Sequence, residues 1–163
     1  MLNLNTDLLV EIVDNFLEPF NCDSDFDSDF FYSSGEQRIY FTLAYSERAD
    51  KLFKQYVLSE FHYEISNIFL LSLLHELGHH LTLSNFSDIE IKKEHKKKRK
   101  IEAELTKTDS DEAFLKYFDL PIEKIATEWA INYYKENKKS CDDFYSIFEK
   151  AVKKEYERLE LAD

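Results

Sequence analysis

The sequence contains very little glycine, proline and cysteine. It has 2 glycines, 2 prolines and 2 cysteines in 163 residues. Because turn-rich β proteins use glycine and proline in their many turns, this scarcity favours long helices. The cysteines, Cys22 and Cys141, are too few for a disulfide framework and suit a reducing compartment. With 44% apolar and 15% aromatic residues, the chain still has enough material for one packed domain spanning residues 1–163.

Basic residues are absent before Arg38, whereas nine acidic side chains lie there. A secretory signal needs a basic start and an unbroken apolar stretch. Here Asp7, Glu11 and Asp14 interrupt the apolar residues near the start of the sequence. No run of about 20 uncharged apolar residues occurs, so the sequence predicts no membrane span. We therefore expect a cytoplasmic protein. The net charge of −12 argues against nucleic acid as a partner, because phosphates repel an acidic body.

The residue pattern predicts an α+β fold that is mostly helical, with a small antiparallel hairpin beside the central helix. Residues 1–37 are expected to form an acidic helix, at 6–18, and a loop. A hairpin is predicted from Phe30–Tyr32 to Arg38–Tyr45, where apolar and polar residues alternate. Beyond Ser46 the spacing is helical, near residues 47–58, 60–82, 88–107, 111–118, 121–138 and 142–160. The charged helix at 88–107 is interpreted as an insertion in a compact domain.

The clearest chemical motif is His75-Glu76-Leu-Gly-His79, inside a long apolar run that predicts a buried helix. On a helix the two histidines are one turn apart and about 40° from each other, so both imidazoles can bind one metal ion. Glu76 lies about 100° further round, beside the open side of such a metal. This is the arrangement of zinc hydrolases, in which the glutamate takes a proton from the attacking water.

A zinc site of this kind needs a third protein ligand. A histidine six residues after His79 is excluded, because Asn85 stands there. The favoured candidate is Glu128, at the edge of an apolar arc on the predicted helix 121–138. Asn132, one turn further on, is expected to orient the ligand through a hydrogen bond. The competing carboxylates are Glu123, Glu102, Glu104 and Asp88.

The segments 75–80 and 128–134 resemble the ImmA/IrrE-type metallopeptidases of bacteria and mobile elements, a family of zincins. These proteins carry the histidine motif and a later helix with the pattern Glu-x-x-Ala-Asn-x-Phe-Ala, which supplies the third ligand. The resemblance implies a compact zincin-like domain with Glu128 and Asn132 in the places of the family's glutamate and asparagine. It also implies a protein or peptide substrate, such as a regulatory or repressor protein of a mobile element.

Further residues are candidates for contact with the substrate. Zincin folds often hold an extended substrate along an exposed strand edge, which makes Arg38, Tyr40 and Thr42 a candidate peptide-binding strand. Tyr133 and Tyr134 follow the favoured third ligand, and a tyrosine hydroxyl can stabilise the oxyanion of peptide cleavage. Packing is the alternative role for both tyrosines.

These residues together predict a zinc metalloprotease in which Glu76 is the general base of peptide-bond hydrolysis. The alternative belongs to another class of protein. It is a non-catalytic, zinc-containing module that binds a regulator or blocks a host factor. Glu76 favours the enzyme, because a purely structural metal site has no use for a carboxylate beside its open position.

The segment Lys92–Lys100 holds seven basic residues among nine. It has three interpretations: a solvated helix that offsets an acidic body, a docking surface for an acidic partner or for the acidic N-terminal segment of this same chain, or a contact with nucleic acid. The segment lacks interleaved aromatic residues and the protein is acidic overall, which argues against nucleic acid.

Overall fold

The computed structural model describes residues 30–33, 38–41, 47–108, 110–147 and 150. The helix expected at 6–18 lies outside these residues. The described elements, in chain order, are β1 (Phe30–Ser33), β2 (Arg38–Phe41), α2 (Glu47–Phe61), α3 (Ile68–Thr82), the 3-10 helix η1 (Leu83–Asn85), α4 (Asp88–Thr108), α5 (Asp111–Phe118) and α6 (Pro121–Glu136). Residues 138–147 are also helical.

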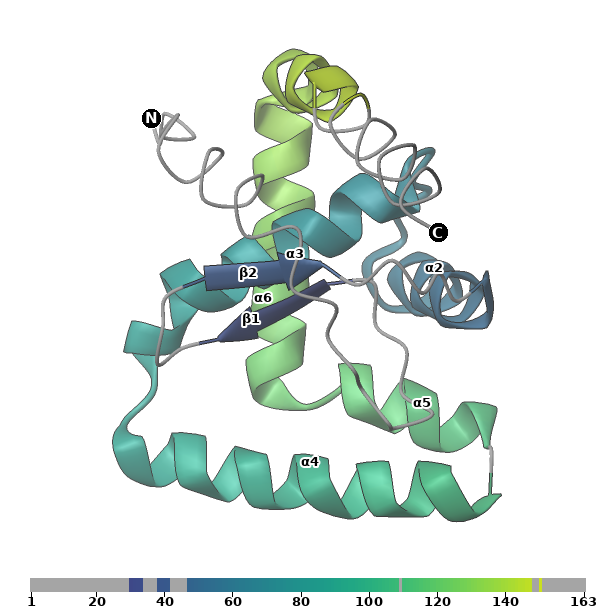
Figure 1. Ribbon diagram of the computed structural model, residues 1–163, viewed down its shortest axis with the longest axis vertical. Helices are drawn as coiled ribbons and strands as arrows, with labels where there is room; N and C mark the ends of the chain where they lie inside the picture. Colours follow the sequence, from purple (N-terminus) through teal and green to yellow (C-terminus); the bar gives the residue numbers. More distant parts are fainter. Residues whose placement is uncertain (1–29, 34–37, 42–46, 109, 148–149, 151–163) are drawn as a thin grey trace, which may run out of the picture.

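Helices α3 and α6 pack against each other at the centre of the fold (Figure 1). The strand pair lies to one side of α3, and α4 runs along the lower edge of the view. The core includes apolar side chains from both central helices, with contributions from β2, α2 and α5. Its most buried members include Val57, Ile65, Leu70, Leu71, Leu74 and Ile131. Strand β1 contacts α3, and α4 contacts α6, so both border the α3–α6 pair.

The expected α+β class is wrong for the described residues, which are mainly helical. The strands β1 and β2 have four residues each and pair antiparallel, with Phe31 opposite Tyr40 and Tyr32 opposite Ile39. Two strands of this length do not amount to a sheet layer. An isolated two-stranded ribbon is at best marginally stable, so this pair needs packing against other elements. The buried side chain of Ile39 supplies that packing by joining the helical core.

The helix predicted at 60–82 begins later than expected, at Ile68. His62 has a φ of 50°, in the left-handed region that commonly follows a helix end, so α2 stops at Phe61. The Asn67 side chain then accepts a hydrogen bond from the backbone N–H of Leu70 and caps the start of α3. None of the described helices combines the length and apolar character needed to cross a membrane.

Gly78 allows α3 and α6 to approach closely. A Cβ atom added at this position would lie 2.6 Å from the backbone oxygen of Ala126 on α6. Backbone atoms cannot move aside as a flexible side chain can, so any larger residue must push the two helices apart. The glycine therefore sets the distance between the two helices, although glycine costs about 1 kcal/mol relative to alanine inside a helix.

Gly78→Ala is expected to lower the free energy of unfolding by about 1–3 kcal/mol, the usual range for overpacking a well-packed core. The higher helix propensity of alanine offsets part of this loss. Denaturant unfolding of the metal-free protein measures the change, with exposed Lys54→Ala on α2 as the control. A Gly78→Ala variant more stable than the wild type would show that α3 and α6 are not in tight contact here.

Candidate metal centre

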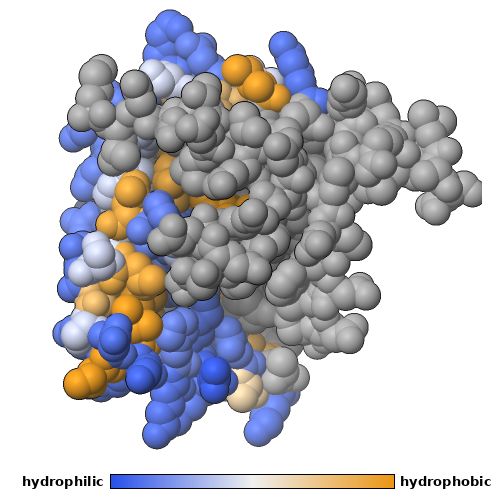
Figure 2. Space-filling view, turned by 60° about the vertical axis from the view of Figure 1, so that its left-hand side comes forward, coloured by the Kyte–Doolittle hydropathy of each residue, from blue (hydrophilic) through white to orange (hydrophobic). Residues whose placement is uncertain are grey.

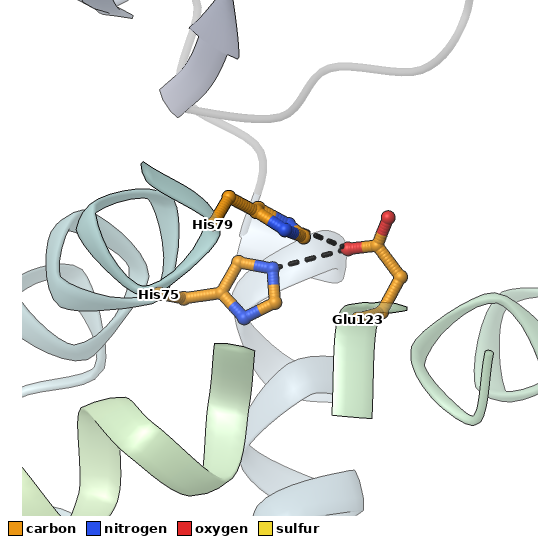
Figure 3. Close-up of side chains that lie close together, drawn as sticks. All are labelled: His75, His79 and Glu123. Carbon is orange, nitrogen blue, oxygen red and sulfur yellow. Dashed lines mark hydrogen bonds and ion pairs between the residues drawn. The ribbon is translucent and has the colours of Figure 1, made fainter. Parts of the chain in front are cut away.

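Two imidazoles from α3 and one carboxylate from α6 meet at a single point (Figure 3). The Nε2 atoms of His75 and His79 lie 3.1 and 3.0 Å from the same oxygen, Oε2 of Glu123. The two histidines are one helical turn apart on α3, and Glu123 lies in the first turn of α6. All three side chains are buried, and among the described residues they form the one group with the spacing of a metal site.

The spacing of these atoms suits a metal ion. Zinc bonds of about 2.0–2.2 Å in a tetrahedral shell place neighbouring ligand atoms about 3.3–3.5 Å apart. The observed separations of 3.0 and 3.1 Å are slightly shorter, so a small outward movement of the side chains would make room for the ion. Two imidazole nitrogens and one carboxylate oxygen are also a common donor set of catalytic zinc sites.

Thr127 orients the ring of His75. The Thr127 hydroxyl donates its only proton to the backbone oxygen of Glu123, 3.0 Å away, so it accepts a hydrogen bond from Nδ1 of His75 at 3.0 Å. In neutral His75 this leaves Nε2 with a lone pair directed at Glu123. A lone pair and a carboxylate repel each other unless a positive charge lies between them, and a metal ion is one such charge.

The carboxylate of Glu123 is held in its ionised form. Burial alone raises its pKa, but the charges of His79 and Lys98, and the hydrogen bonds that both imidazoles donate when their Nε2 atoms carry a proton, hold it well below the usual range. Lys98, on α4, lies 3.4 Å from Oε1 of Glu123 and 4.8 Å from the ring centre of Tyr117. An ionised carboxylate is the form that binds a metal.

Strand β1 holds the carboxylate of Glu76 in place. The backbone N–H of Tyr32 donates to Oε2 of Glu76 over 2.9 Å, and the Tyr32 hydroxyl is hydrogen-bonded to Nδ1 of His80 over 2.8 Å. Burial raises the pKa of Glu76 to about 7, and Glu123 adds to the rise, whereas His75, Lys98 and the Tyr32 N–H lower it. His80 therefore does not face solvent freely; it helps attach the strand to α3.

The structure does not bring Glu128 to the histidines. Its side chain is exposed, and so is that of Asn132, one turn further along α6. Five residues separate Glu128 from Glu123, which is about 140° of helical rotation, so the two carboxylates face different directions. The expectation that Glu128 and Asn132 lie at the histidine pair is corrected: the carboxylate there is Glu123, one of the competing candidates.

Tyr133 and Tyr134 also lie away from the histidines. The Tyr134 hydroxyl donates to Oδ1 of Asp142 over 3.1 Å, and the ring of Tyr133 stacks on Trp129 with centres 4.9 Å apart. Both tyrosines are about 15 Å along α6 from Glu123, since a helix rises about 1.5 Å per residue. Packing, the alternative role for these tyrosines, agrees with this position.

Strand β1 contacts α3 and Glu76, and the predicted peptide-binding strand is its partner β2. Arg38 and Tyr40 lie on β2, and Tyr40 pairs with Phe31 of β1. Thr42 lies outside the described residues. The strand hydrogen-bonded to Glu76 is therefore β1, and a role of β2 in substrate binding stays a prediction.

A signal for Glu123 was present in the sequence. Glu123, Ala126, Thr127 and Ala130 recur at intervals of three and four residues, and all four are buried on α6. Small side chains on one face of a helix indicate a close neighbour, and Gly78 indicates the same on α3. Comparison with known proteins adds nothing to this geometry: no protein-family model, curated protein or solved structure matches the chain.

Proposed function

We propose that this protein is a zinc-dependent peptidase in which His75, His79 and Glu123 hold the metal ion and Glu76 is the general base. The observation that carries the proposal is the convergence of three buried ligand atoms, from two helices, on one point next to Glu76. Burying an ionisable side chain without a partner costs free energy, so a buried cluster of this composition indicates a functional site.

Each residue has a defined part in the proposed reaction. A bound zinc ion supplies Lewis acidity, which polarises a carbonyl group and makes water acidic enough to react near neutral pH. Glu76 accepts the proton of the attacking water and donates it to the leaving amine. The Tyr32 N–H holds one oxygen of Glu76, so the other oxygen is available for the proton. Thr127 holds the His75 ring in its ligand orientation.

The resemblance to the ImmA/IrrE-type metallopeptidases supports the same assignment once the register is moved to Glu123. The pattern Glu-x-x-Ala-Asn-x-Phe-Ala then falls on Glu123, Ala126, Thr127, Trp129 and Ala130. Glutamate and both alanines agree with the pattern, whereas threonine replaces asparagine and tryptophan replaces phenylalanine. Thr127 still provides the hydrogen bond to a histidine that a polar residue at this position can supply. We propose a protein substrate on this basis.

Removal of the metal is expected to abolish hydrolysis and to lower the melting temperature. A ligand that binds only the folded state stabilises it, by about 2.7 kcal/mol at a free concentration of 100 times Kd. The experiment treats purified protein with a chelator and measures zinc content, thermal unfolding and cleavage of a proteome-derived peptide library by mass spectrometry. Readdition of zinc should restore all three properties.

The same measurements separate the peptidase from the non-catalytic module. One outcome is that zinc binds and stabilises the fold while neither the peptide library nor candidate partner proteins are cleaved. This result would support the non-catalytic module, with a purely structural metal site. Cleavage that continues in the metal-free protein would contradict the proposal altogether.

A further inference from the structure

Six of the basic residues of α4 lie on one side of the helix. Lys98 faces inward, with Ile91, Glu94, Ile101 and Leu105, within an arc of about 80° on the buried or half-buried side of the helix. The outer side is here called the basic face, and it spans about 160°. Its members are all exposed and comprise Lys92, Lys93, Lys96, Lys97, Arg99 and Lys100.

The described part of the chain neutralises little of the basic face. Lys97 forms an ion pair with Glu94 at 2.6 Å, and within the described residues no ion pair is found for the other five members. Several of them are spaced by four residues, such as Lys92, Lys96 and Lys100, and like charges at this spacing weaken a helix. Hydrophilic side chains, with some hydrophobic ones among them, lie along the lower edge of Figure 2, at the height of α4 in Figure 1. The described residues thus carry a concentrated positive charge in a chain with a net charge of −12.

Lys98 places this helix at the border of the metal centre. Its ammonium group, on the opposite side of α4 from Lys96, lies 3.4 Å from Oε1 of Glu123. The width of the helix, about 10–12 Å with side chains, separates the basic face from that carboxylate. An extended polypeptide advances about 3.3 Å per residue, so three or four residues cover this distance.

We propose that the basic face is a docking surface for an acidic segment of the protein substrate. This inference rests on the proposed peptidase function, and it specifies the substrate class: a polypeptide with an acidic stretch three or more residues from the cleaved bond. Nucleic acid is a poorer occupant. A duplex extends past α4, and the rest of the protein, with a net charge of −12 overall, repels its phosphates.

The test measures binding separately from cleavage. Fluorescein-labelled peptides of eight glutamates or eight glutamines, each within the same neutral flanks, are titrated with the full-length Glu76→Gln protein, and anisotropy is read at several salt concentrations. Only the glutamate peptide should bind, with an affinity that falls as salt rises. The double variant Lys93→Glu/Lys96→Glu should weaken this binding about tenfold, because it reverses two charges and lowers the net charge of the surface by four units.

The matched control is Lys51→Glu/Lys54→Glu on α2. It changes the net charge equally, at the same spacing of three residues, on another exposed helix face. An equal loss of binding in this control, or tighter binding of a 20-base-pair DNA duplex than of the glutamate peptide, would overturn the proposal. Salt-dependent binding without any cleavage of acidic peptides by the zinc-loaded wild type would count against the peptidase and leave the docking surface intact. Cleavage without a preference for acidic peptides would count against the docking surface and leave the peptidase function intact.

Discussion

Glu76→Gln is expected to lower kcat by a factor of about 10²–10⁴, the usual contribution of a general acid–base residue. Glutamine keeps the size of the side chain and can still accept the hydrogen bond from the Tyr32 N–H, so the strand stays attached to α3. It cannot take a proton from water. Turnover of a cleaved peptide, measured on zinc-loaded protein, gives the change in kcat.

Zinc content and fold serve as the internal check on this variant. Both should equal those of the wild type, because Glu76 is not among the three converging ligand atoms. Glu64→Gln, at an exposed position before α3, should leave kcat unchanged. Full activity in Glu76→Gln would exclude this glutamate as the general base. Loss of zinc in this variant would show that Glu76 is a metal ligand.

The position of the candidate metal centre on α3 follows directly from the sequence. Two histidines four residues apart in an apolar segment need only the geometry of one helix to come together. The structure agrees: His75 and His79 are both buried, and their rings lie 4.6 Å apart. Such a local arrangement depends on no other element, which is why a short motif predicts it.

The partner of these histidines depends on how two helices pack, and the sequence alone pointed to the wrong side of α6. Large apolar residues such as Trp129 and Tyr133 suggested an inward face near Glu128. In the structure these two rings are half-buried and stack on each other. The side that meets α3 is formed by Ala126, Thr127 and Ala130, because Gly78 permits only small neighbours. Hydrophobic bulk predicts burial, whereas close helix contact selects small residues.

The error in the predicted α+β class has a similar origin. The alternation from Arg38 onward favours a strand, but alternation does not indicate how many strands pair or whether they form a layer. Here the two strands contribute four residues each. What matters for the proposed site is one backbone group, the N–H of Tyr32, whose bond to Glu76 joins residues 44 positions apart and has no signature in the sequence.

Glu123→Gln is expected to weaken zinc binding by at least about 100-fold, more than the 10- to 100-fold loss typical of residues that only orient a ligand. The substitution keeps the shape of the side chain but removes the negative charge that the two imidazoles and Lys98 surround. Competition with a chromophoric chelator gives the affinity, and thermal unfolding with and without zinc gives an independent reading through the lost stabilisation.

Glu128→Gln is the matched control, since it makes the same chemical change on the same helix at an exposed position. It should leave zinc affinity within twofold of the wild type, because an exposed carboxylate turned away from the histidines adds little to the field at the metal. The two variants together decide between the competing ligands. Loss of zinc in Glu128→Gln with retention in Glu123→Gln would require α6 to rotate by about 140° when the metal binds, and the tight contact between Gly78 and Ala126 opposes such a rotation.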